Sequence, residues 1–159
     1  MWWLWLLSSA WAGCSLADVE EALAALDHAL VADVRAVEPA SEAVDRQLKC
    51  TRELVSATLA ARIHHTWAVL ALRTRDHDQA ALHLVAAWVA APMIPRHPQM
   101  PTLSEAGDRF AVLQEEVLEE REVTHLPKEM LVDGHPATWV LDGVPAILQA
   151  PGKKPRVVR

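Results

Sequence analysis

Hydrophobic residues recur at helical spacing in two neighbouring segments in the middle of the chain. The first segment carries an apolar stripe at the period of an α-helix, made by Ile63, Trp67, Leu70 and Ala71. The polar residues 73–78 interrupt the pattern, and either Asp76 or Asp78 can cap a second helix with its carboxylate. That helix must end near Pro92, which lacks an amide hydrogen and disfavours helix before it. Residues 61–94 are therefore predicted to form two antiparallel helices joined by a tight turn.

The small and apolar residues of this helical pair resemble one tetratricopeptide repeat, a unit of about 34 residues. In the second helix, the characteristic small, large apolar and closing positions are matched by Ala80, Leu84, Ala87 and Pro92. In the first helix, the packing positions are taken by Trp67, Ala68 and Ala71. Ala68 replaces the usual glycine, and Ala71 stands where the family usually has an aromatic residue. The resemblance implies a helical hairpin of the kind that binds other proteins, and an ordinary alanine-rich hairpin would have the same local fold.

A second helical pair is predicted ahead of this hairpin. After Ser15, apolar residues at helical spacing indicate one helix, and they are Leu16, Val19, Leu23, Leu26 and Leu30. With Asp33 as its cap, the next helix has a stripe formed by Val34, Val37, Val44 and Leu48. Pro39 would lie inside that helix and bend it, so a helix that begins at Pro39 is the alternative.

The two cysteines, Cys14 and Cys50, flank this first helical pair. Two antiparallel helices of about equal length, at about 1.5 Å per residue, bring the two positions together. A disulfide between Cys14 and Cys50 is therefore predicted, since the Cα atoms would lie within bridging distance. On the loop-entropy estimate such a bridge stabilises the chain by about 3–4 kcal/mol.

Residues 1–13 are predicted to be a targeting segment. The apolar run 2–7 is followed by Ala10-Trp11-Ala12, which fits the small-x-small rule for signal cleavage. The segment is short and has no positive residue before the apolar run, which leaves the position of the true start open. The alternative is a hydrophobic helix packed on the body. We expect an exported protein, either in the periplasm or associated with the outer membrane.

The residues Trp11-Ala12-Gly13-Cys14 also resemble a bacterial lipoprotein signal, although Trp11 stands where that pattern prefers leucine. The resemblance implies that Cys14 is acylated and tethers the protein to a membrane. The competing use of Cys14 is the disulfide, which a pair of cysteines in an exported chain favours. Contact with a membrane is expected only if Cys14 carries the lipid.

Four prolines within residues 92–101 predict an extended connector after the central hairpin. Ser104 is then expected to cap a helix whose apolar face carries Phe110, Leu113, Val117 and Leu118. The solvated side of this helix is expected to hold Glu115, Glu116, Glu119, Glu120 and Glu122.

The pattern changes to short apolar runs after His125. The runs 129–133, 137–141 and 144–148 are separated by Asp133-Gly134 and Asp142-Gly143, and Asp-Gly between apolar runs is a strong hairpin signal. The strand and turn formed by Leu131-Val132-Asp133-Gly134 also resemble the small PEGA-type β-modules of bacterial envelope proteins. These strands should pack Trp139 and Ile147 on the last helix. The basic residues after position 152 are expected to form a solvated tail.

The sequence thus predicts a mainly α fold, in which antiparallel tetratricopeptide-like hairpins are followed by a small C-terminal antiparallel β-meander. The expected organisation is a signal segment at 1–13 and a helical domain at 14–122. A β region packed on the helices follows at 123–151, and a basic tail at 152–159. The length of 159 residues suits one core.

Composition and motifs exclude several functions. The formal net charge of −6 argues against a nucleic-acid partner, which would normally meet a basic face. His64 and His65 are neighbours on a helix, so they point about 100° apart and do not share one metal easily. None of the familiar metal-ligand, nucleophile-elbow or phosphate-loop motifs is present. We expect no catalytic residue, no cofactor and no metal.

Three functions follow from these observations. The first is a non-catalytic interaction or scaffold module of the cell envelope with a protein partner of unknown identity. The second is a structural envelope lipoprotein acylated at Cys14. The third is a small metal-binding protein or enzyme that uses His64, His65 or His83. A single repeat favours the second function over a peptide receptor, because a concave groove normally needs about three stacked repeats. Counting the pair from Ser15 to Cys50 as a degenerate repeat brings the number to two and leaves the choice open.

Overall fold

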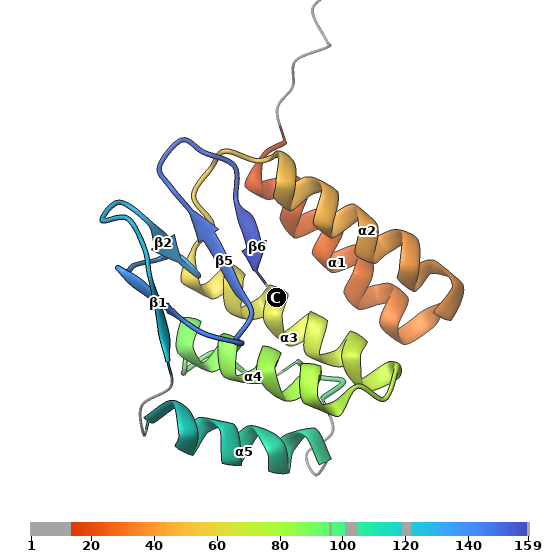
Figure 1. The fold of residues 1–159 in the computed structure, drawn as a ribbon. Helices are drawn as coiled ribbons and strands as arrows, with labels where there is room; N and C mark the ends of the chain where they lie inside the picture. The colour runs from red at the N-terminus through yellow and green to blue at the C-terminus, as the bar shows by residue number, and fades with distance from the viewer. Residues whose placement is uncertain (1–13, 96, 101–104, 119–121, 159) are drawn as a thin grey trace, which may run out of the picture.

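The computed structural model in Figure 1 describes residues 14–95, 97–100, 105–118 and 122–158. The helices are α1 (Leu16–Ala32), α2 (Val34–Cys50), α3 (Ala57–Arg73), α4 (His77–Ala90) and α5 (Glu105–Leu118). The strands are β1 (Val123–His125), β2 (Leu131–Val132), β3 (His135–Pro136), β4 (Trp139–Leu141), β5 (Ala146–Gln149) and β6 (Arg156–Val158). The predicted signal segment and the predicted Ser104 cap lie outside the described residues.

Helices α1 and α2 form the first antiparallel pair, and their caps explain where each helix begins. Ser15 accepts a bond from the Asp18 amide, and its own amide donates to the Asp18 carboxylate, which is a capping box. These bonds from Ser15 hold the pKa of Asp18 below its ordinary value. Asp33 ends α1 and caps α2 by accepting a bond from the Arg35 amide at 3.0 Å.

Pro39 lies inside α2, so the alternative in which this helix begins at Pro39 is wrong. Proline cannot donate to the Arg35 carbonyl four residues earlier, but Pro39 and Arg35 are both exposed, and water can satisfy that carbonyl. Both helices of the pair are 17 residues long, as the disulfide prediction requires. The Cys14–Cys50 disulfide is present, with the Cα atoms 5.4 Å apart.

Helices α3 and α4 form the second antiparallel pair. Ser56 caps α3, and of the two candidate caps for α4 the structure uses Asp76, which accepts from the Gln79 amide at 3.1 Å. The expected packing residues are buried at Trp67, Ala68, Ala80, Leu84 and Ala87, whereas Ala71 is half-buried and Pro92 is exposed. Helix α4 ends at Ala90, before that proline.

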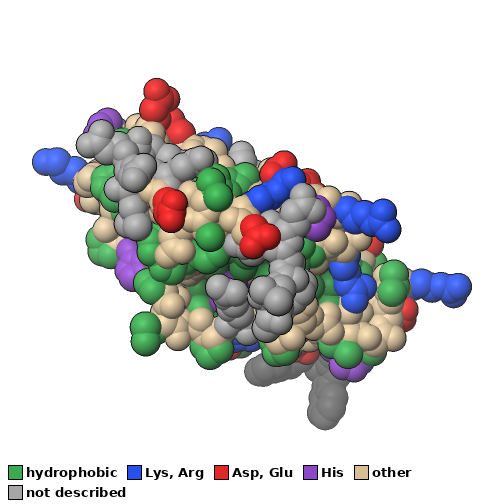
Figure 2. Space-filling model, turned by 90° about the horizontal axis from the view of Figure 1, so that it is seen from below, with side chains coloured by type: hydrophobic (Ala, Val, Ile, Leu, Met, Phe, Trp, Pro, Cys, Tyr) green, Lys and Arg blue, Asp and Glu red, His purple; other side chains and the backbone are tan. Residues whose placement is uncertain are grey.

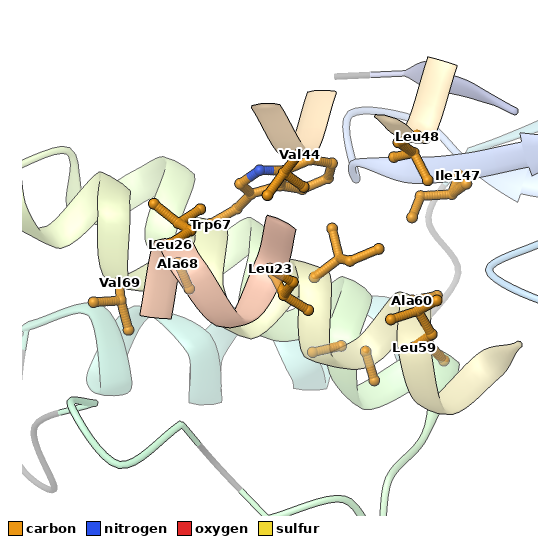
Figure 3. Packing of buried hydrophobic residues seen from close by; sticks show 14 of the residues in the cluster. Leu23, Leu26, Val44, Leu48, Leu59, Ala60, Trp67, Ala68, Val69 and Ile147 are labelled. Atoms are coloured by element: carbon orange, nitrogen blue, oxygen red, sulfur yellow. The ribbon is translucent and has the colours of Figure 1, made fainter. Parts of the chain in front are cut away.

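Figure 1 shows the helices in the order α1 and α2, α3 and α4, and then α5, with the strands gathered to the left of α1 and α2, near one end of α3 and α4. One hydrophobic cluster joins α1, α2, α3 and α4, and it includes Ile147 of β5. Figure 3 shows side chains of this cluster, among them Leu23, Leu48 and Trp67, which come from three different helices. The strands therefore complete the helical core.

The strands form two antiparallel sheets, one with order β1-β4 and one with order β3-β2-β5-β6. The fold-class prediction is confirmed, since helix pairs are followed by small antiparallel sheets. The first Asp-Gly turn joins β2 to β3, with Val132 paired to His135. The second Asp-Gly turn connects strands of different sheets, because β4 pairs with β1 and β5 pairs with β2 and β6.

One sequence prediction about the C-terminal part is wrong. The tail is not a solvated segment throughout, because Arg156–Val158 forms β6 and pairs with β5. Burial of the apolar Val157 against the main core favours this pairing. Ile147 packs into that same core, against which Phe110 of α5 is also packed, and Trp139 remains 46% exposed. Helix α5 also contributes Phe110 and Leu113 to a second cluster with Leu141 and Val144.

One buried side chain ties the end of the chain to the connector between α2 and α3. Gln149 is 2% exposed, and its Oε1 accepts from the Val55 amide at 3.0 Å. Its Nε2 donates to the carbonyls of Glu53 at 2.8 Å and Lys153 at 2.9 Å. The side-chain amide therefore satisfies backbone groups that the connector cannot satisfy by itself.

Candidate functional site

A buried polar cluster links the central helix pair to the β2–β3 turn. The Nδ1 atoms of His64 on α3 and His83 on α4 lie 3.1 Å apart, and Nε2 of His64 lies 3.1 Å from Oδ1 of Asp133. The exposed fractions are 0% for His64, 6% for His83 and 3% for Asp133. We call these three residues the His-His-Asp cluster.

The hydrogen bonds of this cluster are satisfied when Asp133 is a carboxylate and both histidine rings are neutral. A carboxylate at Asp133 can only accept, so His64 donates from Nε2. In a neutral ring, Nδ1 of His64 is then an acceptor, and the proton between the two rings belongs to Nδ1 of His83. The cluster thus forms a directed chain of donors that ends on the Asp133 carboxylate.

The turn that carries Asp133 needs an unusual backbone. Asp133 has φ +48° and Gly134 has φ +80°, the left-handed conformation that a two-residue hairpin turn requires at both positions. A Cβ atom on Gly134 would lie 2.3 Å from the Ala57 nitrogen and 2.8 Å from the Val55 carbonyl oxygen. The absence of a side chain lets the turn sit directly on the start of α3, and Asp133 is thereby placed on His64.

Asp133 is also fixed by the neighbouring strand. Its amide donates to the Ile147 carbonyl at 2.9 Å, and its Oδ1 accepts from the Ile147 amide at 2.7 Å. Trp67 lies against both histidine rings, with ring centroids 5.6 Å from His64 and 5.5 Å from His83. The packing of Trp67 on the histidine rings and the hydrogen bonds between Asp133 and Ile147 hold the cluster in one arrangement.

Within the described residues, no group of three or more histidine, cysteine, aspartate or glutamate side chains is placed to hold a metal ion. His65, the neighbour of His64 in the sequence, is buried at 7% exposure but is not part of the cluster. His77 begins α4, one residue after its cap.

An apolar hollow of about 330 Å³ opens beside Asp133, between α4 and the two sheets. We call it the α4–sheet hollow, and its walls include Ala86, Val89, Ala90, Pro136, Ala137 and Trp139. Alanine and proline supply little side-chain volume at these positions, which is why space remains there. Ligand sites are typically concave, mostly apolar and furnished with a few polar groups, and Asp133 and His135 are polar residues of this wall.

His135 fixes one side of the hollow. Its Nε2 donates to the Ala90 carbonyl at 2.6 Å, at the C-terminal end of α4. This carbonyl belongs to the last turn of the helix, where carbonyls lack partners within the helix. The bond holds β3 against α4 and so keeps the hollow preformed.

The sequence contained the members of this site but not their arrangement. His64, one of the three histidines named above for a metal-binding protein or enzyme, is fully buried. Asp133 was expected only to shape a turn, yet its side chain reaches a residue 69 positions earlier. The sequence shows two histidines on apolar helices and an aspartate in a turn. Hydrophobic periodicity does not indicate which of these side chains contact one another.

Replacing His64 with alanine is expected to destabilise the protein by about 2–3 kcal/mol, since Asp133 and His83 would each lose a buried hydrogen-bond partner. Urea unfolding followed by circular dichroism measures the loss. The matched control is His28→Ala, because His28 is exposed on α1 and should change stability by less than about 0.5 kcal/mol. Equal effects of the two substitutions would show that the cluster contributes nothing.

The surface shown in Figure 2 and the hydropathy of the described helices do not indicate a further binding site. On the face shown in Figure 2, acidic, basic and hydrophobic side chains are interspersed. Such a mixture is unlike the basic stripe of a nucleic-acid interface. In the described part of the chain, none of the helices is long and apolar enough to span a membrane.

Comparison with known proteins adds no relative from which a function could be transferred. No family model, no curated protein and no solved structure matches this chain.

Proposed function

We propose that this chain is an exported, non-catalytic interaction module of the cell envelope that binds a segment of a partner protein in the α4–sheet hollow. The observation that carries the proposal is the preformed apolar hollow with an exposed tryptophan on its wall. Trp139 is 46% exposed and Val89 is 37% exposed, and both line the hollow. Exposed aromatic side chains beside a pocket are typical anchors of protein interfaces.

The size of the hollow supports a single side-chain anchor. A volume of about 330 Å³ is at the low end of ligand pockets, and it can take one or two side chains but no folded element. Strand β4 lies next to the hollow and, among the described strands, pairs with β1 on one edge. Its other edge can therefore pair with an extended segment of the partner protein. Helix α4 of the tetratricopeptide-like pair would then act as the rigid wall against which the segment is held.

The disulfide supports the exported location. Disulfides persist in oxidising compartments and are rare in the cytosol, so the Cys14–Cys50 bond favours a periplasmic or outer-membrane-associated protein. The same bond counts against the structural lipoprotein acylated at Cys14, because one sulfur atom cannot carry both an acyl group and a disulfide.

Site-specific photo-crosslinking tests the proposal in the organism that makes the protein. A benzophenone amino acid placed at Val89 should give one discrete adduct whose partner peptide can be mapped by mass spectrometry. Trp139→Ala should weaken that adduct at least about tenfold, as loss of an interface anchor costs roughly 2 kcal/mol or more.

The control places the same label at His28, which is exposed on α1. If the adducts from His28 and Val89 are the same, or if Trp139→Ala changes nothing, the hollow is not the binding site. Each variant is compared only after its urea unfolding is shown to be cooperative.

A further inference from the structure

We infer that the α4–sheet hollow binds a primary ammonium group, and that the anchor of the partner protein is a lysine side chain whose ammonium pairs with the Asp133 carboxylate. This inference rests on the proposed function and names the residue type that the hollow selects. It follows from a buried carboxylate in the wall of a mostly apolar cavity.

One carboxylate oxygen of Asp133 is already occupied. Both the His64 ring and the Ile147 amide donate to Oδ1, at 3.1 Å and 2.7 Å. Asp133 makes no other side-chain hydrogen bond within the described part of the chain. Oδ2 is therefore the oxygen that a ligand in the hollow can reach, while the two bonds to Oδ1 keep the group from turning.

The carboxylate also lacks a fixed cation. Among the described residues, no lysine or arginine forms an ion pair with Asp133, and its one charged-type partner is the His64 ring. With both histidines neutral, as the donor chain allows, the cluster carries one negative charge. A buried charge without a countercharge is costly, so a ligand that brings a cation compensates a cost already present in the free protein.

The shape of the site favours lysine over arginine. The walls formed by Ala86, Ala90 and Ala137 suit the aliphatic stem of lysine, which packs on apolar surface while its head makes the polar contact. Arginine binds carboxylates best through two parallel bonds to both oxygens, but Oδ1 of Asp133 already has two donors. Oδ2, the one remaining carboxylate oxygen, suits the compact ammonium group of lysine.

His135 can supply a second acceptor for the ammonium. Because its Nε2 donates to the Ala90 carbonyl, Nδ1 of the neutral ring is an acceptor, and His135 lines the same hollow. An ammonium group has three donors. Asp133 and His135 together would then satisfy two of these donors.

Two small probes test the inference on the full chain. Nα-acetyl-lysine methylamide and Nα-acetyl-norleucine methylamide share the same four-carbon side chain, and only the first carries the ammonium. Titrations followed by nuclear magnetic resonance at the Trp139 indole should give a Kd at least about tenfold lower for the lysine probe, as expected for a hydrogen bond to a charged group. The comparison uses the wild-type protein, so it decides even where a variant is unstable.

Asp133→Asn is the matched variant. Asparagine keeps an oxygen that can accept from His64 and Ile147 and tolerates a positive φ, but it replaces Oδ2 with a donor. It should bring the two probes to within about twofold of each other. Equal binding of both probes to wild-type protein would overturn the lysine inference and leave the crosslinking result at Val89 untouched. Binding of neither probe at millimolar concentration would overturn it as well, and the crosslink would still decide whether the hollow binds a partner.

Discussion

Replacing Gly134 with alanine is expected to destabilise the protein by about 4 kcal/mol or more, which is the range of severe core defects. The added methyl group would meet backbone atoms, with the Ala57 nitrogen 2.3 Å and the Ser56 carbonyl carbon 2.6 Å from it. Backbone atoms cannot rotate away, so the turn must lift from α3. Asp133 would then be drawn away from His64. Urea unfolding measures the loss of stability, and the His64 ring signals in nuclear magnetic resonance spectra report the loss of the contact.

Gly152→Ala is the matched control for this substitution. Gly152 also has a left-handed backbone, with φ +69°, but a Cβ atom there would meet no other atom within 4 Å. The expected cost is therefore only the conformational penalty of about 1–2 kcal/mol. A similar loss in both variants would mean that the close approach of the turn to α3 has no energetic weight.

Removing the disulfide by Cys14→Ser together with Cys50→Ser is expected to cost about 3–4 kcal/mol, because the bond closes a loop between positions 36 residues apart. The urea midpoint should fall with a similar slope, and reduction of the wild-type protein should produce the same shift. The double variant gains no further shift from the reductant, which provides the control.

The same bond can be checked in the protein from its native source. The intact mass with and without reduction should show that both cysteines react with an alkylating reagent only after reduction. An added acyl mass on Cys14 would contradict the disulfide and favour the lipoprotein. Two cysteines that react without reduction would contradict both the bond and the exported location.

The helices could be predicted because their signals are local. The apolar stripes and the predicted caps Asp33 and Asp76 depend on residues within one or two turns, and the structure begins α2 and α4 directly after these caps. Val34 was the exception within its stripe, since it is 75% exposed. It begins α2 just after the turn at Asp33, before the stripe meets α1.

The sheets could be predicted only in part, because strand pairing is not local. The Asp133-Gly134 hairpin follows from its two turn residues. The second Asp-Gly turn has the same sequence signal, yet Gly143 turns the chain from one sheet into the other. Strand β5 pairs with β2 on one edge and with β6 on the other. The many basic residues of the tail gave no indication that it contains β6.

The polar site could not be predicted, since its geometry is set by contacts across the whole chain. His64 and His83 are 19 positions apart, which two antiparallel helices of unknown register leave undetermined. Asp133 reaches His64 only because Gly134 rests on the start of α3. The hollow is likewise a property of three elements meeting, and alanines such as Ala86 and Ala137 carry no signal of an empty space.

The position of Gln149 in the sequence determines when the connector between α2 and α3 can form its hydrogen bonds during synthesis. The connector groups at Glu53 and Val55 are made early, but their hydrogen-bond partner comes about a hundred residues later, and so does Ile147 of the main core. Helices α1 to α4 therefore leave the ribosome with an open side that only the last strands close. A chain that stops short of β5 keeps its helical patterns and exposes the core, which makes it a substrate for proteases. The helical core is therefore closed only after β5 has been synthesised.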